Sequence, residues 1–219
     1  MSRAILIYGQ PASGKSYSMR NLNPKTTLII DADKKNGLPW RGWKKNFCKD
    51  NRNYVADNKP TTILSTFRAV SSNEKYKQIK TIVIDGLNTT MNSSQLLNET
   101  KGYEKWTQIA TDIYRICDMA KSLRDDLTII ITAHVELADP NQDNSVDHVK
   151  TPGNLLGKIN IESLFQYVFY AKRNEDGEHF FETQPVHSTA RSPEGCFETI
   201  IPNDLNEVIN TINKYELGE

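Results

Sequence analysis

The stretch Gly9-Gln10-Pro11-Ala12-Ser13-Gly14-Lys15-Ser16 decides the fold of this chain, because it fits the pattern G-x-x-x-x-G-K-[ST] without a gap. The apolar run 4–8 precedes it and predicts a buried strand, and a helix is expected from Gly14 to just before Pro24. A glycine-rich loop in this setting turns successive backbone N–H groups toward one phosphate, and the helix N-terminus adds positive potential. The stretch therefore predicts a phosphate-binding loop, called the P-loop below, rather than an ordinary glycine-rich turn.

The P-loop pattern also assigns roles to its residues. Lys15 is expected to reach the β- and γ-phosphates of a nucleotide, and the Ser16 hydroxyl is expected to bind Mg²⁺. ATP and Mg²⁺ are therefore the predicted cofactors. The predicted nucleotide-binding residues are Gly9, Gln10, Pro11, Ala12, Ser13, Gly14, Lys15, Ser16 and Tyr17.

A second apolar strand, 81–84, ends in Asp85, as a Walker B strand does. Ligands bind at the carboxyl ends of strands in open α/β sheets, so Asp85 is expected to complete the metal site with Ser16. Gly86 follows, where many related ATPases carry a glutamate that acts as the base. The base is therefore expected elsewhere, and Asp31 and Asp33 at the end of strand 27–30 are the candidates. The alternative is that these two acids only cap a turn or a helix.

The apolar strand 127–131 leads into Thr132-Ala133-His134. A polar side chain at this strand end can touch the γ-phosphate, and His134 could donate a hydrogen bond to a phosphate oxygen. The alternative is a hydrogen-bonded histidine at the sheet edge. The other histidines, His148, His179 and His187, have no ligand spacing and are expected on the surface.

Strands that alternate with helices predict an α/β fold with a mainly parallel sheet flanked by helices. Apolar positions three and four residues apart predict helices at 61–78 and 103–124. Residues 34–60 are expected to form a basic insertion with a short helix, and 136–154 a mobile polar loop. The C-terminal part is expected to hold a strand at 164–170, a hairpin turn at 174–177, a strand at 179–182 and a helix at 203–215. We expect one domain that spans residues 1–219.

The composition of the chain excludes several classes of protein. The 219 residues (24.9 kDa) carry 27 Lys and Arg against 27 Asp and Glu, which is unlike a basic nucleic-acid coat protein. No apolar run is long enough for a membrane span or a signal peptide, and three scattered cysteines fit a reducing cytoplasm.

One stretch, 34–52, is basic, with Trp40, Trp43 and Phe47 between its charges. It is either a DNA-binding surface or a solvated face with aromatic anchors. Its basic residues are Lys34, Lys35, Arg41, Lys44, Lys45, Lys49 and Arg52.

Four segments in this order resemble the RecA family of recombination ATPases: GQPASGKS (9–16), LIIDAD (28–33), TIVIDG (81–86) and IITAHV (130–135). Within that family the chain is most similar to the small phage RecA-like ATPases of the Sak type, which are single-strand annealing or recombination proteins. The segments TPGNLLGK (151–158) and 190–192 contribute to this similarity, which spans about residues 3–212.

The resemblance implies a RecA-like P-loop fold and a set of catalytic residues. Lys15 and Asp85 keep the roles given above, Asp33 matches the base and His134 the sensor. Arg191 matches a basic residue that reaches the nucleotide of a neighbouring subunit. Residues 87–102 and 136–154 match the first and second DNA-binding loops.

The predicted function is a Mg²⁺-dependent ATPase that binds single-stranded DNA and promotes phage-type recombination or annealing. The expected partners are single-stranded DNA, a single-strand-binding protein and further copies of this chain, with active sites at the interfaces, in the cytoplasm of a bacterial host. No membrane is expected. A nucleotide or small-molecule kinase is the first alternative, although the lid candidate 138–154 has no arginine. The second is a nucleotide-gated DNA-loading scaffold with little hydrolysis.

Overall fold

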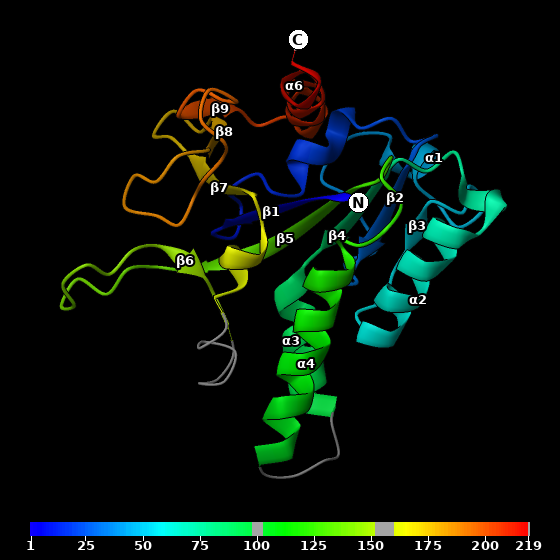
Figure 1. The fold of residues 1–219 in the computed structure, drawn as a ribbon, viewed down its shortest axis with the longest axis horizontal. Helices are drawn as coiled ribbons and strands as arrows, with labels where there is room; N and C mark the ends of the chain where they lie inside the picture. Colours follow the sequence, from blue (N-terminus) through cyan, green and yellow to red (C-terminus); the bar gives the residue numbers. More distant parts are fainter. Residues whose placement is uncertain (98–102, 152–159, 219) are drawn as a thin grey trace.

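The computed structural model describes residues 1–97, 103–151 and 160–218, which form a sheet with helices on both faces (Figure 1). The strands follow the order β3-β2-β4-β5-β1-β7-β8-β9 across the sheet, and the short strand β6 pairs with β5 outside this path. Their bounds are β1 (Arg3–Gly9), β2 (Thr27–Asp31), β3 (Tyr54–Val55), β4 (Thr81–Asp85), β5 (Thr128–Glu136), β6 (His148–Val149), β7 (Tyr167–Arg173), β8 (His179–Glu182) and β9 (Ile200–Pro202).

Strands β3, β2, β4, β5, β1 and β7 run parallel, whereas β8 and β9 are antiparallel additions. The predicted α/β fold class is thereby confirmed, including the C-terminal hairpin, which turns through Asn174–Gly177. The helices are α1 (Trp43–Asn46), α2 (Pro60–Ser72), α3 (Leu87–Leu97), α4 (Tyr103–Met119) and α6 (Leu205–Leu217), with 3-10 helices at Tyr17–Asn21, Glu74–Tyr76 and Ile161–Leu164.

The central strand β1 shows why the sheet is covered on both faces. Its residues 4–8 are all buried, and neighbouring side chains point to opposite faces. Leu6 and Tyr8 pack in the cluster that α2, α3 and α4 cover, while Ile5 and Ile7 pack in the cluster covered by α6, the 3-10 helix after the P-loop and the segment around Phe47. Full burial of each such side chain contributes roughly 1.5–3 kcal/mol to stability.

The helix expected after the P-loop is only one short 3-10 helix, Tyr17–Asn21. The expected start was wrong because Gly14 has a φ of 92°, outside the helical region, and the chain is already extended at Leu22, two residues before Pro24. Two other expectations were also wrong in their bounds. Helix α2 ends at Ser72, where Asn73 turns the chain and caps the next 3-10 helix, and the strand expected at 164–170 begins at Tyr167.

Both segments predicted as DNA-binding loops contain regular structure. Residues 87–97 form α3, which is paired with α4 and extends away from the sheet; the rest of that segment, 98–102, lies outside the described residues. Residues 135–136 pair with 148–149, so the second segment starts as a β-ribbon. Its end, and most of the TPGNLLGK segment, lie outside the described residues as well.

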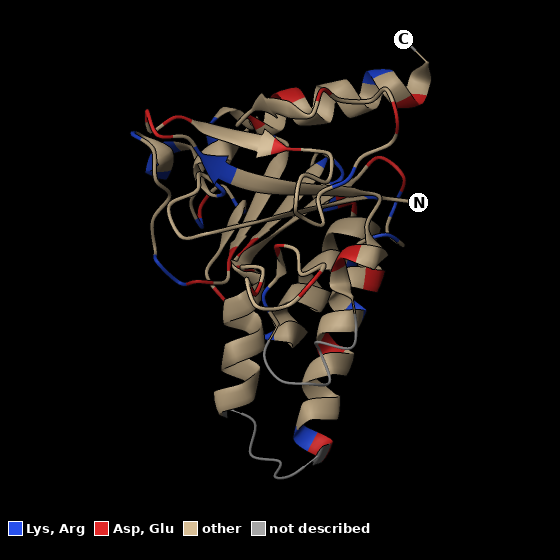
Figure 2. Ribbon diagram, turned by 90° about the vertical axis from the view of Figure 1, so that its left-hand side faces the viewer, with Lys and Arg blue, Asp and Glu red and all other residues tan. Residues whose placement is uncertain are grey.

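Charged residues of both signs are spread over the chain, but α3 (LNTTMNSSQLL) carries none (Figure 2). Within the described ranges, no helix combines the length and the apolar character needed to cross a membrane.

Candidate nucleotide-binding and catalytic site

The P-loop leaves β1 at Gly9, and two of its residues adopt positive φ angles: Ala12 (62°) and Gly14 (92°). Alternating backbone of this kind aims successive N–H groups into one concavity, which is an anion-binding arrangement. In the described part of the chain, the amides of Gly14, Lys15 and Ser16 have no hydrogen-bond acceptor. A ligand with phosphate oxygens would satisfy them.

Both P-loop glycines are needed where they lie. A Cβ atom on Gly9 would come within 2.4 Å of the Ala171 carbonyl oxygen, and one on Gly14 within 2.8 Å of the His179 ring. Real Cβ atoms do not make contacts this short, so the loop packs this closely against Ala171 of β7 and His179 of β8 only because these residues lack side chains.

The Lys15 ammonium group lies inside the P-loop. Its Nζ donates to the carbonyl oxygens of Gly9 (2.8 Å) and Gln10 (2.7 Å). Burial lowers the pKa of Lys15 to about 8, although the charge of Asp85 acts in the opposite direction. The lysine therefore carries a positive charge at neutral pH in a partly desolvated position.

Asp85 lies next to Ser16 at the end of β4. The Ser16 hydroxyl donates to one carboxylate oxygen at 2.7 Å, and the Thr132 hydroxyl donates to the other at 2.7 Å. Thr132 in turn accepts from the Gly86 amide at 2.9 Å. Burial raises the pKa of Asp85, and the two hydroxyl donors counteract this effect. The oxygen atoms of Ser16 and Asp85 are the kind of ligand that Mg²⁺ prefers, so these residues fit the predicted metal.

Asp33 faces the same site from the turn after β2, with a side chain that is 12% exposed. Its carboxylate accepts hydrogen bonds from the Lys35 ammonium (2.6 Å) and from the Thr89 hydroxyl. Burial raises the pKa of Asp33, but these two donors outweigh it and hold the pKa below its ordinary value. Asp31, the other candidate base, accepts from the Tyr54 hydroxyl and the Asn36 amide and so holds its own turn together.

Gly86 and Asp33 compete for the same space. Gly86 has a φ of 105°, and a Cβ atom there would lie 2.2 Å from an Asp33 oxygen. A glutamate could not follow Asp85 without displacing Asp33, which accounts for the glycine at this position. The Asp33 carboxylate occupies the place next to Asp85 that a side chain at position 86 would take.

This contact predicts that Gly86→Ala destabilises the protein. Strain at the positive φ and the clash with Asp33 together should cost about 2–4 kcal/mol, which lowers Tm by roughly 5–10 °C for a chain of this size. Gly195→Ala is the matched control, because Gly195 also has a positive φ (75°) but has nothing near its Cβ position. Thermal unfolding followed by circular dichroism measures both variants. Equal shifts in the two would show that Asp33 does not crowd position 86.

His134 lies on β5 directly opposite Gly9 of β1. Its backbone amide donates to the Asn88 side chain (2.6 Å), and its buried Nδ1 has no partner among the described residues. Burial and the nearby Lys15 charge lower its pKa, while Asp33 raises it, so the ring is neutral at neutral pH. The structure thus brings Lys15, Ser16, Asp33, Asp85 and His134 together at one edge of the sheet.

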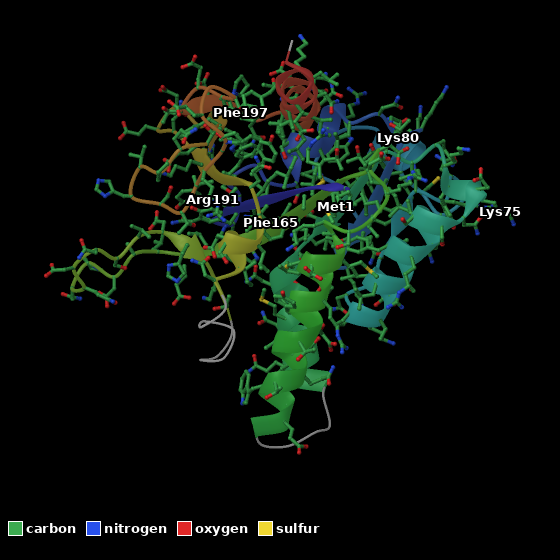
Figure 3. All side chains as sticks on the ribbon, in the orientation of Figure 1. Met1, Lys75, Lys80, Phe165, Arg191 and Phe197 are labelled. Atoms are coloured by element: carbon green, nitrogen blue, oxygen red, sulfur yellow. The ribbon has the colours of Figure 1, made fainter. Side chains whose placement is uncertain are left out.

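Arg191 is not part of this group. Its side chain donates to the backbone carbonyls of Phe165 (3.0 Å) and Glu162 (Figure 3), and its backbone pairs with Val168 near the start of β7. Since Val168 lies beside Leu6, Arg191 is set back from the edge where the P-loop begins. In this structure the guanidinium group holds its own chain together, and the expected reach of Arg191 to the nucleotide of a neighbouring subunit stays a prediction.

His179 corrects another expectation. It was expected on the surface, yet its ring packs against Gly14 and lies 6.1 Å from the Tyr17 ring, centroid to centroid. The pairing of Arg173 with His179 in the C-terminal hairpin sets this position. The sequence reasoning gave Thr132 no role of its own, although it lies in the segment IITAHV, and it expected His179 on the surface because no motif marks that residue.

The basic segment 34–52 is anchored by its aromatic residues. Phe47 is buried, and Trp40 and Trp43 are partly buried against the same core cluster, so these rings anchor the segment. Lys34 and Lys35 are paired with Asp57 and Asp33. The remaining cations of the segment are exposed, without an ion pair in the described structure: Arg41, Lys44, Lys45, Lys49 and Arg52.

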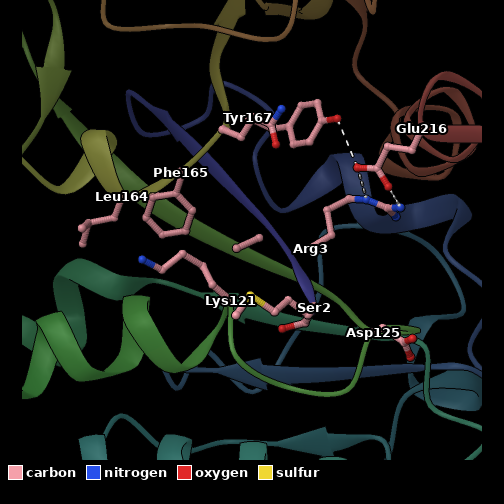
Figure 4. Close-up of a pocket in the computed structure, with 11 residues that line it drawn as sticks. Ser2, Arg3, Lys121, Asp125, Leu164, Phe165, Tyr167 and Glu216 are labelled. Atoms are coloured by element: carbon pink, nitrogen blue, oxygen red, sulfur yellow. Dashed lines mark hydrogen bonds and ion pairs between the residues drawn. The ribbon is translucent and has the colours of Figure 1, made fainter.

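A pocket of about 330 Å³ lies at the opposite, amino-terminal end of the sheet (Figure 4). Three of its polar side chains are bound to one another: Arg3 pairs with Glu216, which also accepts from the Tyr167 hydroxyl. It lacks the unpaired amides and the buried carboxylates of the P-loop site.

Comparison with known proteins agrees with the site. The profile of a family described as "AAA domain" matches residues 1–193. A search of the curated proteins found no match.

Proposed function

Since the chain belongs to the AAA domain family of P-loop ATPases, we propose that it is a Mg²⁺-dependent ATPase that works on single-stranded DNA, as the small phage RecA-like ATPases that it resembles do. This proposal rests on one observation. Five side chains lie together at the carboxyl ends of the parallel strands: Lys15, Ser16, Asp33, Asp85 and His134. The P-loop amides and Lys15 would hold the β- and γ-phosphates.

Each remaining residue has a role that its contacts allow. Ser16 and Asp85 would hold Mg²⁺, which neutralises charge on the phosphates when bound. Thr132 fixes the Asp85 carboxylate through its hydroxyl. Asp33 orients the attacking water, and its low pKa keeps it ionised. His134, neutral and with one nitrogen free of partners, donates a hydrogen bond to the phosphate that is released.

The exposed cations of segment 34–52 are the favoured DNA-binding surface. Lys35 in this segment contacts Asp33, so the surface adjoins the proposed base directly. The loop 136–147 is a weaker choice, because it carries Glu136, Asp139, Asp143 and Asp147 and no basic residue. We propose that the protein acts as an oligomer in phage-type recombination or annealing, with a single-strand-binding protein as a further partner.

Steady-state ATP hydrolysis with and without a long single-stranded oligonucleotide tests this proposal. We expect stimulation by DNA that fades as salt rises, because phosphate contacts release counterions. The triple variant Lys44→Glu/Lys45→Glu/Lys49→Glu should lose the stimulation and keep the basal rate. The control is Lys75→Glu, a charge reversal outside the segment. If DNA still stimulates the triple variant, DNA binds to another surface of the protein.

One observation favours a second candidate, a nucleotide-gated DNA-loading scaffold with little hydrolysis. The Asp33 carboxylate is already bound by Lys35 and Thr89, which leaves it a weak base. The scaffold predicts tight ATP binding with slow turnover that DNA does not raise, so the same assay separates the two functions.

Lys15 also makes ATP binding dependent on pH. Bound phosphates favour the charged lysine, so its pKa in the complex lies above the value of about 8 in the free protein. Affinity should therefore fall by about twofold between pH 7 and 8 and more steeply above pH 8, by at most about tenfold per pH unit. Titration with a fluorescent ATP analogue between pH 7 and 9.5 measures this. A flat profile across that range would contradict the assigned contact.

A further inference from the structure

The ribbon formed by β5 and β6 extends beyond the sheet (Figure 1), and its backbone pairing changes where it begins. Val135 pairs with Val149, so His134 and Lys150 are the next pair in this register. Opposite residues of a hydrogen-bonded antiparallel pair exchange two N–H···O bonds. Among the described residues only one of these bonds forms here, from the Lys150 amide to the His134 carbonyl at 2.8 Å.

The side chain of Asn88 takes the place of the second bond. Its Oδ1 accepts from the His134 amide at 2.6 Å, and its Nδ2 donates to the Lys150 carbonyl at 2.6 Å. The carboxamide is therefore inserted between the two strands as an extra rung of the ladder. Asn88 is only 5% exposed, so removal of its side chain leaves a buried amide and a buried carbonyl without partners.

The position of the His134 ring depends on its backbone. The ring makes no hydrogen bond to the described residues, and its buried Nδ1 is unpartnered. His134 also borders a cavity of about 330 Å³, whose wall includes Pro11 of the P-loop, so the packing around it leaves room for movement. Since β1 ends opposite His134, at Gly9, the Asn88 carboxamide restrains β5 at the point where this pairing stops.

The next residue of α3 contacts the proposed base. The Thr89 hydroxyl donates to the Asp33 carboxylate, and the Thr89 amide donates to the Gly86 carbonyl at 3.0 Å. Asn88 and Thr89 are neighbours in the first turn of α3, which begins at Leu87. One helical turn therefore holds both the proposed base and the residue that is proposed to contact the released phosphate.

We propose that Asn88 is a positioning residue for ATP hydrolysis, because its carboxamide fixes the end of β5 and thereby places His134 beside the P-loop. This inference rests on the proposed ATPase function, in which His134 donates to the released phosphate. Asn88 acts through His134 and not on the phosphate itself, since both of its amide atoms are engaged by backbone groups. The same contact ties the start of the β5–β6 ribbon to α3.

A double-mutant cycle on basal ATP hydrolysis by the full chain, without DNA, tests the inference. Asn88→Ala should lower kcat by about tenfold to a hundredfold, because a small displacement of a group that contacts the reacting phosphate is costly, and should leave KM within a few-fold. In the His134→Ala background the same substitution should lower kcat no further, because the group through which Asn88 acts is absent.

Asn53→Ala is the matched control. Asn53 is 3% exposed and also joins backbone groups: its Oδ1 accepts from the Cys48 amide (3.1 Å), and its Nδ2 donates to the carbonyls of Pro24 (2.9 Å) and Asn46 (2.8 Å). Both alanine variants should lower Tm by roughly 3–10 °C, and Asn53→Ala should keep the wild-type kcat. Asn88→Ser keeps a short hydroxyl, so it is the second variant and should have an intermediate kcat.

NMR provides a readout that does not depend on hydrolysis. The signals of the His134 imidazole, assigned by their loss in His134→Ala, should shift in Asn88→Ala or Asn88→Ser and should stay in place in Asn53→Ala. If the wild type does not hydrolyse ATP, the proposed function fails, and the NMR spectra still show whether Asn88 places the ring.

Three results would overturn the inference. The first is a wild-type kcat in a folded Asn88 variant. The second is an equal loss of kcat in the wild-type and His134→Ala backgrounds, which would mean that Asn88 acts independently of His134. The third is an unchanged imidazole signal in the Asn88 variants.

Discussion

Lys15→Ala is expected to reduce ATP hydrolysis by at least about a hundredfold, the loss typical for removal of one group that stabilises transition-state charge. The ammonium group is the cation that the P-loop encloses, and it now binds the Gly9 and Gln10 carbonyls. Its removal deprives the transferred phosphoryl group of a positive partner and leaves two carbonyls without their donor. Phosphate release under steady-state conditions, with and without DNA, measures the effect.

Lys25→Ala is the control for this variant, because Lys25 is an exposed lysine in the turn before β2. It should hydrolyse ATP at the wild-type rate. Circular dichroism melting shows whether Lys15→Ala remains folded. A folded Lys15→Ala variant with a tenth or more of the wild-type activity would mean that hydrolysis does not take place at the P-loop.

Asp33→Asn should lower kcat by about 10²–10⁴, the usual contribution of a general base, while the affinity for ATP stays within a few-fold. The amide keeps the shape of the side chain and one oxygen acceptor for Lys35 or Thr89. It cannot accept a proton, so a loss confined to kcat identifies Asp33 as the residue that orients and activates water.

Asp57→Asn provides the comparison for Asp33→Asn. Asp57 also has a lysine partner, Lys34, and the Thr62 and Lys59 donors hold its pKa below the ordinary value against the effect of burial. It has no contact with Asp85 or the P-loop. If Asp33→Asn and Asp57→Asn both keep the wild-type rate, the base lies elsewhere and the scaffold function gains support.

The parts of the site that could be predicted from the sequence are those at the ends of apolar strands. Asp85 and His134 each follow a buried parallel strand, and the carboxyl ends of such strands meet at one edge. The P-loop motif marks the same edge. These three features could be placed together without knowing any contact between side chains.

Contacts that depend on pairing between distant strands could not be predicted. Thr132 reaches Asp85 because β5 lies beside β4, and His179 reaches Gly14 because the hairpin folds back next to β1. The role of Gly86 is clear only once the Asp33 carboxylate is seen in the space beside it. Arg191 was assigned by resemblance, and its bonds to the carbonyls of Glu162 and Phe165 follow from the neighbouring 3-10 helix.

Short or weakly patterned elements were also missed. Strands β3 and β6 have two residues each, too few for any periodicity to appear. Helix α3 is rich in Asn, Ser and Thr, which have low helix propensity, and packing against α4 stabilises it. The helix after the P-loop was overestimated because Gly14, its expected first residue, has a positive φ of 92° and belongs to the loop.

The place of β1 in the sheet has a consequence for the order of folding. This strand is synthesised before both of its neighbours, β5 and β7, which belong to the second half of the chain. Pairings so far apart in sequence close slowly, because a long loop must be ordered before any contact compensates for it. The strand β1, which is apolar on both faces, therefore stays unpaired until β5 and β7 have been synthesised. Refolding from denaturant should be slow and prone to aggregation until β7 has paired with β1.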